Sequence, residues 1–502
     1  MTAVAKNDSF GSVPEVDLAG YSIDASVIPS VPASLAEKYN LMPLFKAGKN
    51  LTVAMSDPKN VLALDELRTA SGMEISVVKS NEKQIKEAIS EYYGISAVIE
   101  DVVKNYKPIG EAKKVKVIGE EAAPIVKLVN VLITQALRER ASDIHIEPEH
   151  NDVRVRFRVD GVLHEESVMP QFMSAPLVSR IKVLAGMDIA ENRVPQDGRF
   201  EIKESGRSID FRISTFPSAY GEKVVIRILD KGSMLYGLTD IGFSEENYKK
   251  FLGLIHKPHG IILITGPTGS GKTTTLYAAL GEINSKELNV TTVEDPIEYE
   301  LPGITQSQIN VKAGLTFASA LRSILRQDPD VVLVSEIRDG ETAAIAVQAA
   351  LTGHMVFSTL HTNDSSGAIV RLIDMKVEPF LIASSLEGVM AQRLVRTICK
   401  KCKIEAPPPE ELKQRFPEIK SLAKGTGCKA CKGSGFKGRT GIFELLIIDD
   451  QIRQMITRKA SSDEIRKYAV EHGMKTLYQD GMEKVKAGAT TLDEVLRVTE
   501  LE

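Results

Sequence analysis

The sequence has no large excess of acidic or basic residues, and this absence restricts the kinds of molecule that the protein is expected to bind. Its 63 Lys and Arg residues and 67 Asp and Glu residues give a net charge of −4. A nucleic-acid-binding protein is usually basic over a face or a whole domain, so the composition disfavours that class. Hydrophobic residues make up 43% and charged residues 26%, as in ordinary globular proteins.

Long hydrophobic runs are also missing. No apolar stretch approaches the ~18 residues that span a bilayer, and the first residues lack the basic segment and apolar core of a signal peptide. We therefore expect a cytoplasmic protein that reaches a membrane only through partners. The four cysteines are too few for a disulfide framework in a long intracellular chain.

Shifts in composition divide the chain into segments. Residues 1–97 mix short apolar runs with helical stretches and predict a small α/β domain, and 98–123 form a charged linker punctuated by Gly and Pro. In 124–230, a helical pattern from Pro124 precedes the alternating VRVRFRV (153–159) and an Asp160-Gly161 turn, which predict a mostly antiparallel domain. The remaining segments are an α/β core at 245–398, a cysteine module at 399–431 and a helical subdomain at 432–502.

The core segment contains a phosphate-binding loop. Apolar strands (GIILIT, NVTTVED, VVLVSE and HMVFSTLH) alternate with helical stretches, which predicts a largely parallel sheet with helices on both faces. GPTGSGKT follows the first strand and precedes a helix, the context in which G-x-x-x-x-G-K-[ST] binds phosphate. Lys272 should reach the β- and γ-phosphates, and the Thr273 hydroxyl should bind Mg²⁺. The predicted nucleotide-binding residues are Gly266, Pro267, Thr268, Gly269, Ser270, Gly271, Lys272, Thr273 and Thr274.

Carboxylates and histidines follow or precede other strands of this sheet. Glu336 ends VVLVSE, 64 residues after Lys272, and should act on Mg²⁺ directly or through water. Glu294, Asp295 and Glu298 follow another strand and could supply the base that hydrolysis needs; the pattern alone does not choose between them. His354 and His361 bracket the fourth strand.

The cysteines form two C-x-x-C pairs, Cys399/Cys402 and Cys428/Cys431, with 25 residues between them. This spacing predicts a tetrahedral, structural Zn²⁺ site, although the intervening loop is a little longer than in common zinc ribbons. A redox dithiol and a nucleic-acid-binding ribbon are the alternatives.

The motifs GPTGSGKT, TVEDPIEY, LRQDPDVVLVSEIRD and TGHMVFSTLHTN together resemble the Walker A, Asp box, Walker B and His box of the secretion-superfamily ATPases. The nearest resemblance is to the ATPases of type II secretion and type IV pilus assembly, and it runs from about residue 120 to the C-terminus. It implies an α/β RecA-like P-loop core, a PAS-like α+β second domain, a small N-terminal partner-docking domain, a Cys₄ zinc insertion and a helical C-terminus.

The resemblance also implies residue roles and partners. Glu298 would be the base with Glu294 in reserve, Glu336 would act on Mg²⁺, and both histidines would sense or position the γ-phosphate. Four arginines would complete the site between subunits of a homo-hexamer: Arg212, Arg227, Arg322 and Arg326. The implied partners are an inner-membrane platform protein and a membrane-anchored protein with a cytoplasmic domain.

Three other functions are compatible with parts of this pattern. A type IV pilus extension ATPase shares the core and the Cys₄ insertion, whereas pilus retraction motors lack that insertion. A nucleic-acid translocase could use the same core with a zinc ribbon, although the near-neutral charge argues against it. A scaffold that binds nucleotide without hydrolysis is disfavoured by the complete set of Lys272, Thr273, Glu298 and Glu336.

Overall fold

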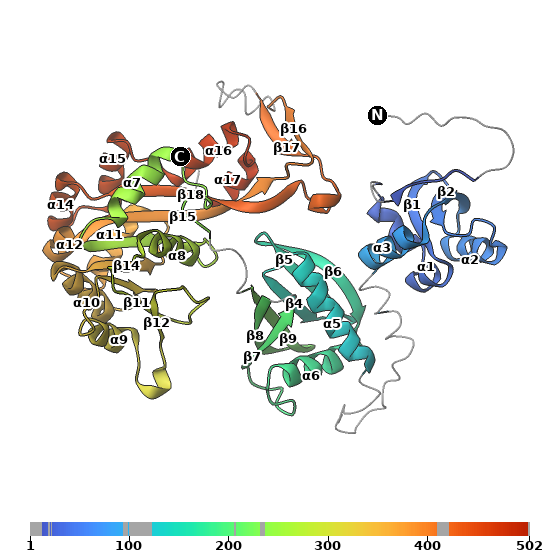
Figure 1. Cartoon of the computed structure of the whole chain (residues 1–502), viewed down its shortest axis with the longest axis horizontal. Coiled ribbons are helices and arrows are strands. Elements are labelled where there is room, and N and C mark those ends of the chain that lie inside the picture. Colours follow the sequence, from blue (N-terminus) through green and yellow to red (C-terminus); the bar gives the residue numbers. More distant parts are fainter. Residues whose placement is uncertain are drawn as a thin grey trace. The chain divides into compact units, whose positions relative to one another are not determined.

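The computed structural model describes residues 13–93 (except 19, 20 and 22), 99, 123–204, 207–230, 236–408 and 421–499. The chain divides into two compact units, residues 1–230 and 231–502, and each is described by itself (Figure 1). The predicted linker at 98–123 lies outside the described residues apart from its positions 99 and 123. Among the described residues, no helix is both long and apolar enough to cross a bilayer.

The N-terminal part of the first unit is a three-stranded sheet with helices. β2 pairs antiparallel with β1 and parallel with β3, and the helices pack on it through one apolar cluster. Its elements are a 3₁₀ helix at Ala25–Ser30, α1 (Ala33–Tyr39), β1 (Leu41–Ala47), β2 (Asn50–Met55), α2 (Val61–Ser71), β3 (Glu74–Lys79) and α3 (Glu82–Tyr92).

The remainder of the first unit is a six-stranded antiparallel sheet in the order β6-β5-β4-β9-β8-β7, which agrees with the predicted antiparallel domain. Val153, Val155 and Phe157 are fully buried, because alternate residues of a strand share one face, and they pack with α5 and α6 in one cluster. The elements are α5 (Ala123–Arg138), β4 (Asp143–Pro148), β5 (Asp152–Val159), β6 (Val162–Pro170), α6 (Ser174–Leu184), β7 (Gln196–Glu204), β8 (Arg207–Ser218) and β9 (Gly221–Asp230).

The second unit is built on a seven-stranded sheet in the order β12-β11-β13-β14-β10-β15-β18. The first six strands pair in parallel, and β18 pairs antiparallel with β15 at one edge. The strands are β10 (Gly260–Thr265), β11 (Val290–Glu294), β12 (Thr305–Gln308), β13 (Val331–Val334), β14 (Met355–Leu360), β15 (Leu386–Ile398) and β18 (Phe436–Ile447). The segment predicted as helical from residue 432 therefore begins with a strand of this sheet.

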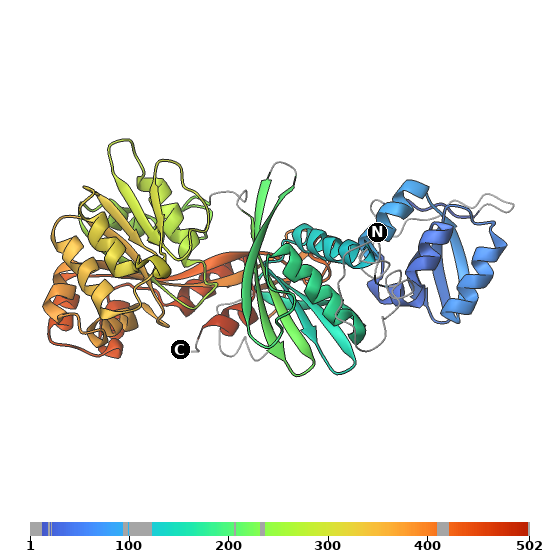
Figure 2. The ribbon, with the colours of Figure 1, turned by 90° about the horizontal axis from the view of Figure 1, so that it is seen from below.

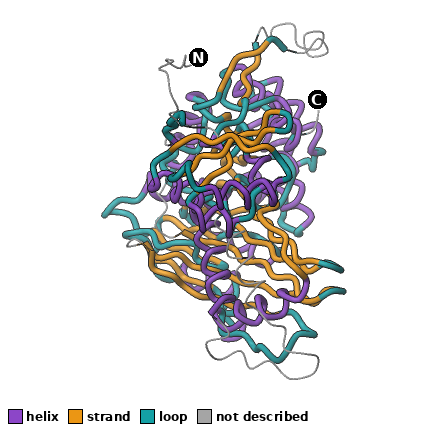
Figure 3. Tube along the Cα trace, turned by 90° about the vertical axis from the view of Figure 1, so that its right-hand side faces the viewer, coloured by secondary structure: helices purple, strands orange, loops and turns teal. Residues whose placement is uncertain are grey.

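Helices cover both faces of this sheet; Figure 3 colours the helices purple and the strands orange. Ile261 and Leu263 of β10 pack with one set of helices, whereas Ile262 and Ile264 pack with α7 and α8 on the other face. Burial on both faces explains why the central strands read as continuous apolar runs. The helices are α7 (Glu245–Ile255), α8 (Lys272–Ile283), α9 (Phe317–Ile324), α10 (Gly340–Leu351), α11 (Ser365–Asp374), α12 (Pro379–Ser385), α14 (Asp450–Thr457), α15 (Ser462–Glu471), α16 (Leu477–Lys486) and α17 (Leu492–Val498).

β15 and β18 extend past the other strands as a long two-stranded ribbon (Figures 1 and 2). At its end, β15 leads into Cys399, and the short hairpin of β16 (Lys403–Ala406) and β17 (Leu422–Gly425) follows. α16 and α17 pack on this ribbon through a separate apolar cluster. The cysteine module is thus carried on two strands that also belong to the ATPase sheet.

Candidate functional site

The phosphate-binding loop lies between β10 and α8, as the sequence predicts. Gly266, Gly269 and Gly271 have φ values of 147°, 79° and 90°, a region that side chains disfavour. A Cβ on Gly266 would also lie 2.6 Å from the carbonyl oxygen of Gln392. Glycine is therefore required where the loop passes against β15.

Lys272 begins α8 and is directed back over the loop. Its ammonium group donates hydrogen bonds to the carbonyl oxygens of Gly266 (2.8 Å) and Pro267 (3.1 Å). Burial lowers the pKa of Lys272 to about 8, with Arg393 adding to this effect and Glu336 opposing it. A phosphate group at this loop would supply the missing counter-charge, and the N-terminus of α8 adds further positive potential.

Three other strands end at the same sheet edge as β10. Because β11, β13, β14 and β10 run parallel, their carboxyl ends meet beside the phosphate loop, the usual position of ligand sites in open parallel sheets. Glu294 ends β11, Glu336 follows β13, and His361 follows β14. The residues that follow these strands therefore converge at one edge of the sheet.

Glu336 has two side-chain neighbours, Arg338 and His361. It pairs with Arg338, and its Oε2 lies 3.5 Å from Nε2 of His361. The hydrogen bond to Glu336 raises the pKa of Arg338, and Asp295 adds to the effect, so the loop after β11 lies near the loop after β13. Glu336 also counteracts the lowering of the Lys272 pKa by burial.

The two histidines lie at opposite ends of β14. His354 precedes the strand, its carbonyl accepts from Gly260 at the start of β10, and its Nδ1 lies 2.8 Å from the Ala349 carbonyl. Seven residues separate it from His361, which is about 20 Å along a strand. Within one subunit, His361 therefore lies at the end of β14 beside the phosphate loop, whereas His354 lies at the other end of the strand.

The acids after β11 occupy different environments. Glu294 is 1% exposed and accepts hydrogen bonds from Tyr277, from Thr292 Oγ1 (2.6 Å) and from Gln306 Nε2 (3.0 Å). Glu298 is half-buried in the following loop. This contrast separates two acids that the sequence could not separate.

Two further residues of the loop region escaped the sequence analysis. Arg393 of β15 donates to the carbonyl oxygens of Gln392 (3.0 Å) and Asn363 (2.8 Å), and Gln392 accepts from Thr275 of α8 (2.8 Å). Through these hydrogen bonds, Gln392 and Arg393 connect β15 to α8, which begins at the phosphate loop, and to the segment after His361. The signal available in the sequence was a pair of polar residues between the apolar runs GVMA and LV of this strand.

The arginines predicted to act between subunits lie on both units. Arg212 of β8 is directly opposite Arg227 of β9 on the sheet face away from α5 and α6. Arg227 Nε donates to Asp143 (3.1 Å), yet the Arg227 side chain is 57% exposed. Arg212 lies 3.8 Å from Asp210.

Arg322 and Arg326 lie in the second unit near α9. Arg322 pairs with Glu341 of α10, whereas Arg326 contacts the Arg322 carbonyl (2.9 Å) and Ser323. α9 ends at Ile324, so Arg322 lies in its last turn and Arg326 follows the helix. Both side chains are exposed.

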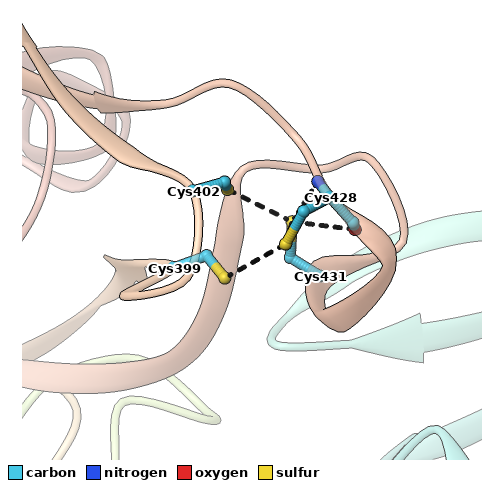
Figure 4. A group of neighbouring side chains, drawn as sticks. All are labelled: Cys399, Cys402, Cys428 and Cys431. Carbon is cyan, nitrogen blue, oxygen red and sulfur yellow. Dashed lines mark hydrogen bonds between the residues drawn. The ribbon is translucent and has the colours of Figure 1, made fainter. Parts of the chain in front are cut away.

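The four cysteines converge at the end of the β15–β18 ribbon (Figure 4). Their sulfur atoms all lie within 4.8 Å of one another, with Sγ–Sγ distances of 3.7 to 3.8 Å for Cys399–Cys428, Cys402–Cys431 and Cys428–Cys431. Sulfurs about 2.3 Å from a tetrahedral Zn²⁺ lie about 3.8 Å apart, and a disulfide needs about 2.05 Å. Backbone N–H groups of Cys428 (3.2 Å) and Gly435 (3.3 Å) donate to Cys431, which suits a thiolate. The cluster therefore fits Zn²⁺.

Comparisons with known proteins show which families the chain resembles. Residues 119–497 match the family model of the type II/IV secretion system protein, and residues 12–98 match the MshEN domain model. The chain is 48% identical to type II secretion system protein E of Dickeya dadantii over 491 residues, 94% of this chain and 98% of the relative. It is 52% identical to the type II secretion system ATPase E of Vibrio cholerae over 385 residues, 76% of each chain.

Pilus ATPases are also similar to the chain. The type IV pilus assembly ATPase PilB of Myxococcus xanthus is 43% identical over 500 residues, 96% of this chain and 88% of that protein. Among solved structures, the pilus retraction motor PilT with bound ADP is 28% identical with a TM-score of 0.51, over 74% of this chain and 96% of that one. The Legionella pneumophila ATPase DotB, at 21% identity and a TM-score of 0.55 over 74% and 94%, shows the shared fold.

Proposed function

The chain belongs to the type II/IV secretion system protein family, and on that premise we propose that it is a hexameric ATPase that drives pseudopilus assembly and protein export by type II secretion. The family and the ATPase fold predicted from the sequence motifs are confirmed by these matches. The observation that carries the proposal is the meeting of Lys272, Glu336 and His361 at one sheet edge.

The substrate is ATP, with its phosphates in the loop at 266–274. Lys272 compensates the charge of the β- and γ-phosphates, and His361 faces the γ-phosphate side beside Glu336. Thr273, exposed at the start of α8, and Glu336 would hold Mg²⁺, which neutralises phosphate oxygens when bound. Glu298 orients the attacking water and takes its proton, since Glu294 is buried and already accepts three hydrogen bonds.

The site is completed by arginines of a neighbouring subunit. Arg212 and Arg227 form an adjacent pair on the sheet face away from α5 and α6, a suitable geometry for bridging phosphate oxygens. Arg322 and Arg326 would act from the second unit. An arginine supplied in this way increases the rate of phosphoryl transfer by a factor of about 10³–10⁵. Hydrolysis would therefore depend on assembly of the ring.

The remaining parts serve assembly and docking. Zn²⁺ in the Cys₄ site closes the tip of the β15–β18 ribbon as a structural element. The N-terminal domain would dock to a membrane-anchored partner, and motion between the second domain and the core would act on an inner-membrane platform protein. The protein would then be cytoplasmic and reach the membrane only through these partners, without direct contact to nucleic acid.

Type IV pilus extension is the second candidate, because a pilus assembly ATPase is 43% identical over nearly the whole chain. Relatives in type II secretion reach 55% identity over 391 residues, which favours export. Deleting the gene and comparing secreted proteins with surface pili distinguishes the two: loss of export with intact pili supports our proposal, and the reverse result supports the pilus function.

The ATPase part is tested by turnover against protein concentration. The rate per subunit should rise steeply as rings form, and the cytoplasmic part of a platform or anchor protein should raise it further. A rate per subunit that stays constant down to clear monomer would contradict a site shared between subunits.

A further inference from the structure

We infer that Tyr277 is a positioning residue for the catalytic base, coupling the phosphate-loop helix to the loop that carries Glu298. This inference rests on the proposed function, in which Glu298 is the base. Tyr277 lies on α8, five residues after Lys272, and is 1% exposed. In the sequence it occupies an apolar helical position, so nothing there distinguishes it from a core residue.

The Tyr277 hydroxyl joins both acids of the loop. It donates to Glu294 Oε2 and accepts from the backbone N–H of Glu298 at 3.4 Å. An ionised carboxylate only accepts hydrogen bonds, so the Tyr277 proton points to Glu294 and its lone pair remains for Glu298. Burial, together with the bond to Glu294, raises the pKa of Tyr277, which keeps this proton in place at ordinary pH.

Other contacts fix the same loop to the same carboxylate. Gln306 Nε2 bridges Glu294 Oε1 (3.0 Å) and the Tyr299 carbonyl (3.2 Å), and Gln306 Oε1 accepts from Leu301 N–H (2.7 Å). The Tyr299 ring packs edge-on against Tyr277, with centroids 4.5 Å apart. Glu294 thus acts as a buried anchor, and Tyr277 is its link to α8.

The consequence is a direct path from the nucleotide to the base. α8 begins at the phosphate loop, so a shift of the loop on binding ATP moves Tyr277 and, through its hydroxyl, the backbone of Glu298. Tyr277 itself contacts no substrate atom in this scheme. Its removal should therefore slow the chemical step without weakening ATP binding.

Tyr277→Phe removes the hydroxyl and keeps the ring. We expect kcat to fall about tenfold, because a small misplacement of a catalytic group costs up to ~10² in rate, while KM for ATP stays within about twofold. Tyr248→Phe is the matched control: Tyr248 packs on the same cluster and should behave as the parent. Ring assembly and thermal unfolding are measured alongside.

A double-mutant cycle separates positioning from general damage. In a Glu298→Gln background, Tyr277→Phe should cause no further loss, and an additive loss would overturn the inference. If Tyr277→Phe does not fold, Glu294→Gln is used instead and should give the same pattern of lowered kcat, constant KM and no added loss with Glu298→Gln. Parent-like hydrolysis by Glu298→Gln overturns the base assignment; an inactive Glu298→Gln with a parent-like Tyr277→Phe overturns only this inference.

Discussion

The phosphate-loop edge of the second unit and the arginine face of the first unit are built in opposite ways. At the edge, Glu336 and Glu294 are held by side chains of neighbouring loops, strands and α8, and they are 14% and 1% exposed. On the arginine face, Arg227 pairs with Asp143, and its side chain remains 57% exposed. The first arrangement is held by contacts within one chain, whereas the second leaves Arg227 largely exposed, which is compatible with its proposed action on another subunit.

Replacing the outward-facing charge should have the largest effect. Arg227→Ala should lower kcat by about 10³ or more, because an arginine at the transferring phosphoryl group contributes about 10³–10⁵. ATP affinity should change little, since Lys272 and the loop remain intact. Steady-state kinetics on assembled rings measures both. A loss confined to KM would mean that Arg227 does not act on the transition state.

At the phosphate-loop edge, Glu298→Gln should lower kcat by roughly 10²–10⁴, the usual range for a general base. The affinity for ATP should be retained. Glu294→Gln should cost less than Glu298→Gln, because Glu294 positions the loop. Single-turnover hydrolysis on both variants checks the order. If Glu294→Gln were the more damaging change, the two roles would have to be exchanged.

A change in the cysteine module tests whether hydrolysis at the phosphate-loop edge depends on the bound Zn²⁺. Cys399→Ser should abolish one bound Zn²⁺ per chain and lower the unfolding midpoint by roughly 5 °C, equivalent to about 2 kcal/mol. Turnover per assembled ring should fall only a few-fold. The phosphate loop contacts β15 at Gln392 and Arg393, whereas Cys399 follows the end of that strand. Metal analysis, calorimetry and ATPase rates distinguish this result from a catalytic metal, whose loss would abolish turnover.

Because of Lys272, ATP binding at the phosphate-loop edge should depend on pH, whereas the arginines of the first unit should keep their charge over the same range. Its pKa is lowered to about 8 by burial, so above pH 8 the nucleotide-free form loses the cation that ATP requires. Binding must then restore the proton, and the Kd for ATP should rise by up to about tenfold per pH unit above pH 8. Below pH 8 the Kd should be flat. Titration calorimetry in two buffers checks the proton uptake.

The sequence predicted the parts of this site that follow continuous apolar runs. β10, β11, β13 and β14 are buried on both faces, and their carboxyl ends carry the motifs. β15 was missed because Gln392 and Arg393 interrupt its pattern, and these are the residues that contact the phosphate loop. Tyr277 was missed because its role depends on which loop its hydroxyl reaches.

His354 shows what topology adds to a motif. Both histidines flank one short strand, but only the carboxyl ends of parallel strands share the edge with the loop, and His354 precedes the strand. The arginines were identified through the family resemblance alone, because an exposed arginine in a strand or helix carries no signal of a neighbouring subunit. These residue roles remain predictions.

Mixing two inactive variants tests the shared site most directly. Lys272→Ala lacks a working phosphate loop but retains Arg227, and Arg227→Ala has the reverse defect. In rings assembled from equal amounts of both, about a quarter of the sites pair an intact loop with an intact arginine across a head-to-tail interface. The account predicts that turnover returns to roughly that fraction of the parent rate; a mixture as inactive as its separate components would contradict it.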